Sequence, residues 1–267
     1  MKLNLRSGFG ILLLLLVISS CSTANLISKE TMVGLQPPET DMNVNQLRHD
    51  IATTIDPSGT YQTASSMEVV ATDTWDSTIV RWLTPLDRNV QRFRAFLKLR
   101  HNGIEFTFLD GDQTGEIIGF DGQSYRYAGK RKQYEESAAI SLYLDPLQRY
   151  LEWPCTLVND PNLTLLGSRS INGTPYWIAY VTEGDTTRLD QHDQFLVYIN
   201  KKRKTVDYIE FTMRKLMDSY RGVVHYKDFK EVQGVVMPFW IGIAGDLAEP
   251  DFDHFFTIES IQLHHTN

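Results

Sequence analysis

The chain has 267 residues, of which 33 are acidic and 26 are basic, so its formal net charge at pH 7 is −7. Nucleic acids require a concentrated basic surface, so this balance argues against a nucleic-acid partner. Hydrophobic residues make up 42% of the chain and aromatic residues 11%, which is enough to build a sizeable core. Its two cysteines, Cys21 and Cys155, do not make a disulfide framework.

The first 20 residues have the order of a secretory signal peptide. Lys2 and Arg6 precede an uncharged apolar run over residues 9–18, and two small residues, Ser19 and Ser20, follow it. A membrane-spanning helix needs about 20 apolar residues, so this run is too short to span a bilayer. We therefore predict a signal peptide over residues 1–20 that is removed from the mature protein.

Cys21, the residue after Ser19 and Ser20, carries a second sequence signal. Ile18-Ser19-Ser20-Cys21 resembles a bacterial lipobox; the alternative is an ordinary signal peptide followed by a chance cysteine. The resemblance implies that Cys21 receives a diacylglycerol and a further acyl chain (palmitate-type lipidation), and two or more chains anchor a protein stably. Ser22, where an Asp would imply inner-membrane retention, implies an outer-membrane lipoprotein that faces the periplasm.

Signal removal changes the mature chain in two ways. Loss of Lys2 and Arg6 leaves 24 basic against 33 acidic residues, so the acidic excess grows. A lipidated Cys21 also leaves Cys155 without a partner in the chain. Cys155 lies in the apolar stretch "YLEWPCTLV", where we expect an inert, small hydrophobic residue rather than a reactive thiol.

A flexible tether is predicted for residues 21–42, because "STANLISKETMVGLQPPETD" is polar, contains Pro37-Pro38 and shows no sustained period. "MNVNQLRHDIATTI" then has Val44, Leu47 and Ile51 at helical spacing. It predicts a short helix, capped by Asp41, that ends before Pro57-Ser58-Gly59. About 247 mature residues are enough for one large domain or two small ones; we assign residues 43–267 to one.

After Tyr61 the apolar residues alternate, which predicts antiparallel strands. "STIVRWLT" and "VQRFRAFLKLRH" alternate, the latter with apolar residues on one face and basic residues on the other. Turn residues predict four hairpins, at 101–103, 121–122, 172–173 and 201–204. "GVVHYKDF", "GVVMPFWIGI" and "HFFTIESIQLHH" predict the closing strands.

The stretch "ESAAISLYLDPLQRYLEW" departs from this alternation and predicts two short helices broken at Asp145-Pro146. An antiparallel sheet commonly buries one face and leaves the other in water. The predicted fold is therefore mainly β with a few α elements: a curved antiparallel sheet with short helices covering its concave face.

This order of elements resembles the lipoprotein-carrier fold of LolA and LolB. The resemblance covers residues 44–265 and rests on "FDGQSYRYAGKRKQ", "ISLYLDPLQRYL", "GTPYWIAYV", "FLVYINKKRKTVDYIEFTM" and "YKDFKEVQGVVMPFWIGI", in which a Gly and a Pro are expected to interrupt the ladder. It implies that the curved sheet forms an incomplete barrel (a half barrel) with a helical lid over an apolar cavity. Proteins of this shape include carriers, acceptors and stress sensors; a lipidated chain fits an acceptor or a resident binder.

Histidines and carboxylates that could form a catalytic or metal site occur at three places in the sequence. Asp251, Asp253 and His254 form one acidic cluster with a histidine; Asp190, His192 and Asp193 form another, and His264-His265 lies at the end. Both clusters equally fit polar turns, neither has the helical spacing of a zinc motif, and no phosphate loop or serine elbow is present. We therefore predict no catalytic residues, metal or cofactor.

Aromatic residues recur on strand after strand, and most are expected to pack in the core. A sheet covered only by short helices leaves part of its concave face open, which suits an acyl chain. The leading hypothesis is non-catalytic binding of a lipid or other apolar ligand; the alternatives are a scaffold lipoprotein for envelope protein partners and a His/Asp hydrolase. The candidate ligand-binding residues are Trp82, Phe93, Phe108, Tyr125, Tyr127, Trp177, Tyr180, Phe211 and Trp240.

Overall fold

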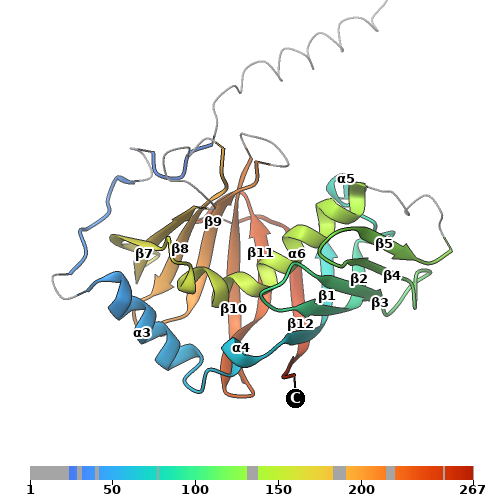
Figure 1. The fold of residues 1–267 in the computed structure, drawn as a ribbon. Helices are drawn as coiled ribbons and strands as arrows, with labels where there is room; N and C mark the ends of the chain where they lie inside the picture. Colours follow the sequence, from blue (N-terminus) through green and yellow to red (C-terminus); the bar gives the residue numbers. More distant parts are fainter. Residues whose placement is uncertain are drawn as a thin grey trace, which may run out of the picture.

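In a computed structural model, all the strands among the described residues form one antiparallel sheet (Figure 1). The structure describes residues 24–28, 32–39, 42–76, 78–130, 138–182, 191–214, 220–248 and 250–266, without the side chains of residues 79, 80, 138 and 253. The strands are β1 (Ser66–Trp75), β2 (Val90–Lys98), β3 (Ile104–Phe108), β4 (Ile117–Phe120), β5 (Tyr125–Ala128), β6 (Thr164–Ile171), β7 (Thr174–Thr182), β8 (Gln194–Asn200), β9 (Val206–Thr212), β10 (Arg221–Val232), β11 (Val235–Ala244) and β12 (Phe252–His264).

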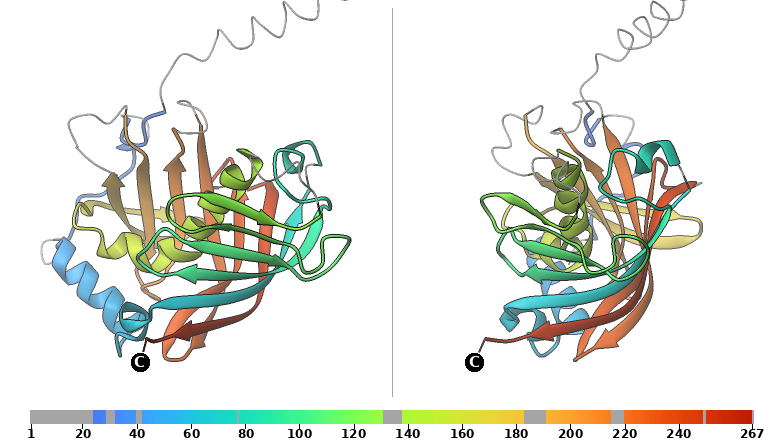
Figure 2. Two further views of the ribbon diagram at one scale, coloured as in Figure 1. Left: turned by 45° about the vertical axis from the view of Figure 1, so that its right-hand side comes forward. Right: turned by 90° about the vertical axis from the view of Figure 1, so that its right-hand side faces the viewer.

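The sheet is open. Its 12 strands lie in the order β5-β4-β3-β2-β1-β12-β11-β10-β9-β8-β7-β6, so β5 and β6 form its two edges. The first and last strands are neighbours, paired from Ser66↔His264 to Trp75↔His254. The sheet curves around a helix without closing (Figure 2), which confirms the predicted mainly β, incomplete-barrel architecture.

The alternation in the sequence places the core. Along β2 every second residue is buried, with Phe93, Ala95 and Leu97 inside and Arg92 and Arg94 outside. A strand directs successive side chains to opposite faces, so this pattern fixes the concave face as the apolar one. The predicted division of the strand into an apolar and a basic face is confirmed.

All four predicted hairpins are present. Asn172 and Gly173 have φ values of 49° and 79°, as a two-residue type I′ turn requires. A further turn at Gln233-Gly234, with φ values of 52° and 85°, joins β10 to β11. Gly234 therefore belongs to a turn, and Pro238 lies inside β11 opposite Phe229.

Helix α3 (Val44–Ile55) forms where predicted and ends at Ile55, but its cap differs. The side-chain oxygen of Asn43 accepts hydrogen bonds from the N–H groups of Asn45 and Gln46, both at 3.0 Å, so Asn43 is the N-cap. The predicted cap, Asp41, lies outside the described residues. A short helix, α4 (Thr60–Thr63), follows.

The predicted break at Asp145-Pro146 is wrong. Helix α6 (Ala138–Thr156) continues through both Pro146 and Pro154 and crosses the concave face, followed by the 3₁₀ turn η2 (Leu157–Asn159) (Figure 2). An interior proline costs a helix one main-chain hydrogen bond. Burial of Leu144, Leu147 and Leu151 against the sheet offsets this cost, since packing rather than propensity determines most helices in proteins.

The strand predicted at "STIVRWLT" is also wrong, because Thr78–Arg81 forms a short helix, α5. The side chain of Asn89 accepts from Nε of Arg81 at 3.0 Å and donates to Oγ1 of Thr78 at 2.9 Å. The Asn89 carbonyl also accepts from the N–H of Trp75 at 2.7 Å. These contacts, made by a residue 8 positions after Arg81 and 11 positions after Thr78, outweigh a short alternating pattern.

The main core lies between the concave face and the helices, and a second buried cluster lies on the other face of β6 to β8. Leu26, from the segment predicted to be a tether, is fully buried in that second cluster. Among the helices that the structure describes, none is long and apolar enough to cross a membrane.

Candidate functional site

An open cavity of about 350 Å³ lies between α6 and one end of the sheet. Helix α6 contributes Leu142, Pro146, Leu147 and Tyr150 to its wall, and their spacing places them along one side of the helix. The opposite wall comes from the last residues of β1 and β11, the first residues of β12 and the segment after α5. The cavity is therefore a gap between the helical lid and the strand ends.

The lining of this cavity is mostly apolar. Ile243 and Phe256 point from the sheet, and Leu83 and Leu142 stand at the opening, with exposures of 61% and 42%. A volume of about 350 Å³ falls within the range of about 300–1,000 Å³ that is typical of small-molecule sites. The cavity thus has the size and surface for an alkyl chain.

A buried polar cluster contributes Tyr143 and His254 to the cavity wall. Nε2 of His254 lies 2.7 Å from Oδ1 of Asp73, and the Tyr143 hydroxyl donates to Oδ2 of Asp73 at 2.6 Å. Burial, reinforced by the Asp73 carboxylate, raises the pKa of the Tyr143 phenol well above its ordinary value. Because a phenol that stays protonated donates to a carboxylate, Asp73 has a partner on each oxygen.

Trp75 fixes the orientation of the His254 ring. The two residues are direct cross-strand partners, and their rings stack with centroids 3.6 Å apart and planes 16° apart. Phe256 adds an edge contact with the imidazole, with ring centroids 4.5 Å apart. His254, Tyr143 and Trp75 all line the cavity. A bound apolar ligand would therefore contact polar side chains whose orientation is fixed by these hydrogen bonds and ring contacts.

An adjoining pocket of about 430 Å³ shares Leu142, Pro146 and Met213 with the cavity and is more polar. The Tyr125 hydroxyl donates to Oδ1 of Asp145 at 2.5 Å, and Arg149 pairs with Asp193 at 3.6 Å. Together the two spaces form an apolar cavity that adjoins a pocket whose lining includes the charged residues Asp145, Arg149 and Asp193. This arrangement fits a ligand with an apolar body and a polar end.

Most of the predicted ligand-binding aromatics pack away from this cavity. Four of them, Phe93, Phe108, Trp177 and Phe211, are buried in the main core, and Tyr180 is buried in the second cluster. Phe93, for example, stacks on Phe106 at 4.5 Å. These five side chains pack within the two buried clusters and do not line the cavity beside α6.

The remaining four predicted residues are more exposed. Tyr125 borders the adjoining pocket, and Tyr127 donates its hydroxyl to Oε2 of Glu116 at 2.5 Å. Trp240 is half-buried, with Nζ of Lys227 4.6 Å from its ring centroid. Trp82 is 68% exposed, next to Leu83 at the mouth of the cavity.

Sequence reasoning missed the buried polar cluster. It grouped His254 with Asp251 and Asp253, whereas the structure pairs it with Asp73. A signal for Asp73 was present: in "SMEVVATDTW" it occupies the row of Met67, Val69 and Ala71, all fully buried. A carboxylate in a buried row needs a partner, but the sequence does not show which residue supplies it.

The second acidic cluster forms no metal site in the described residues. Asp193 accepts from the N–H of Arg214 at 2.8 Å and pairs with Arg149, while Asp190 lies outside the described part of the chain. The described residues contain no group of three or more His, Cys, Asp or Glu side chains arranged to hold a metal ion.

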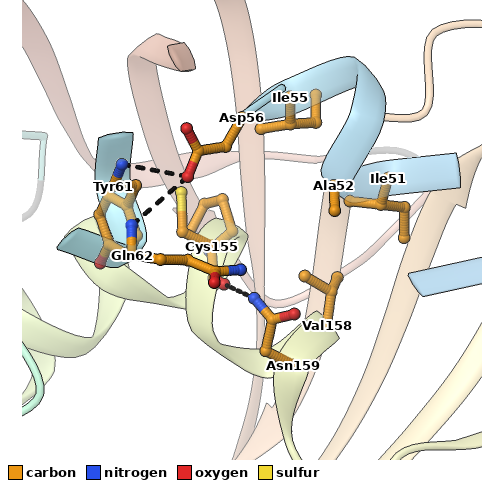
Figure 3. Close-up of a pocket in the computed structure, with 10 residues that line it drawn as sticks. Ile51, Ala52, Ile55, Asp56, Tyr61, Gln62, Cys155, Val158 and Asn159 are labelled. Atoms are coloured by element: carbon orange, nitrogen blue, oxygen red, sulfur yellow. Dashed lines mark hydrogen bonds between the residues drawn. The ribbon is translucent and has the colours of Figure 1, made fainter. Parts of the chain in front are cut away.

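A small notch between α3 and the end of α6 contains Cys155 (Figure 3). Its volume is about 20 Å³, which is room for roughly one water molecule. Asp56 accepts there from the N–H of Tyr61 at 3.0 Å, and Asn159 donates to the Cys155 carbonyl at 2.9 Å. Burial raises the pKa of the Cys155 thiol to about 12, so the thiol stays protonated and unreactive at neutral pH.

Solved structures share this fold. A domain described as a candidate outer membrane lipoprotein-sorting protein from Vibrio parahaemolyticus matches with a TM-score of 0.50 and 10% identity, over 83% of this chain and 92% of that one. A LolA superfamily protein from Nitrosomonas europaea matches with a TM-score of 0.49 and 12% identity, over 85% and 96%. The sequence matches no family model and no curated protein. The LolA-like fold is thus confirmed, as a fold alone.

Proposed function

We propose that the chain is a lipid-anchored envelope protein that binds a lipid or another apolar ligand in the cavity beside α6, without catalysing a reaction. The observation that carries this proposal is the open cavity of about 350 Å³, whose mostly apolar wall includes Tyr143 and His254 from a hydrogen-bonded polar cluster. Its size suits a single acyl chain.

The cellular location in this proposal comes from the sequence. The signal peptide and the lipobox-like segment ending at Cys21 support lipidation, and Ser22 supports an outer-membrane lipoprotein that faces the periplasm. Cys21 lies outside the described residues. The fold shared with a candidate lipoprotein-sorting domain is compatible with this location.

A hydrolase is the second candidate, because a histidine and a carboxylate do meet beside a cavity. In a nucleophilic hydrolase such a pair activates a neighbouring hydroxyl or thiol. Among the described residues that line the cavity, Thr84 offers an aliphatic hydroxyl, and that hydroxyl donates to the Arg81 carbonyl at 2.7 Å. This geometry favours binding over catalysis.

Native mass spectrometry of protein produced without residues 1–21 tests the proposal. We expect a co-purifying lipid, or uptake of a fluorescent fatty acid by delipidated protein. Protein with neither would contradict ligand binding. Turnover of a fatty-acid ester that wild type performs and His254→Ala does not would instead place the protein among hydrolases.

A further inference from the structure

The segment after the lipidation site docks on the sheet at the strand ends that border the cavity, and we propose that this docking holds the mouth of the cavity against the bilayer surface. The inference rests on the proposed lipid anchor at Cys21. It adds an orientation: the ligand passes between the cavity and the membrane that anchors the protein, without crossing water.

Residues 24–26 are bound to the strand ends. Leu26 is fully buried, and its N–H donates to Oε1 of Gln194 at 2.8 Å. Nη2 of Arg214 donates to the carbonyl of Ala24 at 2.8 Å, while Nε of Arg214 donates to the carbonyl of His192 at 2.7 Å. One arginine thus joins the docked segment to the loop before β8.

A second contact fixes the same segment farther along. Gln36 and Ser168 exchange two backbone hydrogen bonds, both at 2.8 Å, on the edge strand β6. A Cβ atom at Gly167, whose φ is +152°, would lie 2.2 Å from the Gln36 carbonyl oxygen. The edge is therefore shaped to accept this segment, because only glycine permits so close an approach.

These contacts lie on the opposite face of the sheet from the cavity, at the strand ends that border it. Arg214 directly follows Met213, which lines both the cavity and the adjoining pocket, and Gln194 directly follows Asp193 of that pocket. Three Cα–Cα steps separate Cys21 from Ala24, so the two Cα atoms are at most about 11 Å apart. An anchor at Cys21 therefore keeps this end of the sheet close to the bilayer.

The same end presents two exposed apolar side chains. Trp82 is 68% exposed and Leu83 61% exposed, and Leu83 also lines the cavity. Figures 1 and 2 place α5, which these residues follow, at the same end of the sheet as the first described residues. Tryptophan favours the membrane–water interface. The exposed pair is therefore suited to contact lipid at the mouth of the cavity.

Trp82 fluorescence in the full-length, lipidated protein tests the orientation. The protein is reconstituted into phosphatidylethanolamine/phosphatidylglycerol vesicles with brominated acyl chains, which quench tryptophan at short range. We expect wild type to be quenched and Trp82→Phe to lose most of that quenching. Trp240→Phe, on a half-buried tryptophan of β11, is the matched control and should leave quenching unchanged.

Two further variants separate docking from anchoring. A Gly/Ser insert of about 12 residues between Thr23 and Ala24 leaves every docking residue in place but lengthens the mean reach to about 20 Å. It should lower Trp82 quenching roughly twofold or more while membrane flotation is unchanged. Leu26→Ser, which weakens docking, should act in the same direction.

The outcomes are distinguishable. The proposed orientation is wrong if Trp82→Phe does not reduce quenching, or if the insert leaves quenching unchanged. In either case, fatty-acid uptake by the same protein would still support the binding function. Wild type that does not float with vesicles overturns both the anchor and the orientation.

Discussion

Asp73 and His254 are 181 residues apart in the sequence, yet Nε2 of His254 lies 2.7 Å from Oδ1 of Asp73. The pair joins the first strand of the sheet to the last, and Tyr143 connects both to α6. A fully buried carboxylate is stable only when its oxygens are paired. The same cluster that contributes to the cavity wall therefore also links the sheet to its lid.

Asp73→Ala should destabilise the protein by about 3 kcal/mol, because it leaves His254 and Tyr143 buried without their acceptor. Urea unfolding measures the effect, and Asp73→Asn, which keeps an acceptor oxygen, should lose less. Glu68→Ala is the control, on the outer face of β1. Oε1 of Glu68 lies 3.6 Å from Nε of Arg94, and both side chains are partly exposed, so this variant should lose less than about 1 kcal/mol of stability. Equal losses in the Asp73 and Glu68 variants would contradict the structural role of the cluster.

Local signals predicted much of the fold. Asn172-Gly173 marks its hairpin because both residues need positive φ, and the alternation in β2 fixes the apolar face. The local pattern gives the wrong prediction where contacts outside the pattern determine the structure: Asn89 holds residues 78–81 in a helix, and packing against the sheet keeps α6 helical through Pro146.

The candidate site could be predicted only in outline. An apolar space under a helical lid follows from the arrangement of strands and helices. The residues that line it lie at strand ends and on α6, where no period marks them. Most of the predicted aromatic residues lie at strand positions that the alternating pattern marks as apolar. Side chains at such positions mostly pack into the core. The meeting of Asp73 with His254 depends on β1 pairing with β12, which strand patterns alone do not reveal.

Glu152 should make stability fall as the pH rises. Burial raises the pKa of its carboxyl to about 7, against opposing effects of Gln148 and Arg100. A carboxyl whose pKa is higher in the folded state binds its proton more tightly there, so its stabilising contribution is present below about pH 4.5 and is lost as the pH rises through about 7. Glu152→Gln should be more stable than wild type at pH 8 by about 1–2 kcal/mol; unfolding midpoints across this range measure it, and an unchanged pH profile would contradict the assignment.

His225 should act in the opposite direction. Burial lowers the pKa of its imidazole to about 4, with Lys227 contributing and the Asp246 carbonyl opposing. The unfolded state then binds more protons below about pH 6.5, so stability is lost as the pH falls from about 6.5 toward about 4. Replacing His225 with Phe keeps the ring contacts with Tyr208 and Phe252 and should reduce this loss of stability at acidic pH. If the variant loses stability with falling pH as steeply as wild type does, a group other than His225 causes the loss.

Cys21→Ala should release the protein from the membrane. The thiol is the site that would receive the lipid, so the variant should appear in the soluble periplasmic fraction and lose incorporation of an alkyne-labelled palmitate. Cys155→Ala is the matched control, since that thiol is buried; it should keep both properties. Palmitate incorporation in Cys21→Ala would show that the anchor lies elsewhere.

The most direct measurement of ligand binding compares fluorescent fatty-acid uptake by two charge-introducing variants, Leu142→Arg and Phe96→Arg. Leu142 stands at the cavity opening with 42% exposure, while Phe96 lies near the end of β2 with 37% exposure, outside the cavity lining. A guanidinium at the opening would obstruct the cavity and disfavour an apolar chain. Binding in the cavity beside α6 predicts that Leu142→Arg weakens uptake roughly tenfold or more while Phe96→Arg binds like wild type; equal affinity in both folded variants would contradict it.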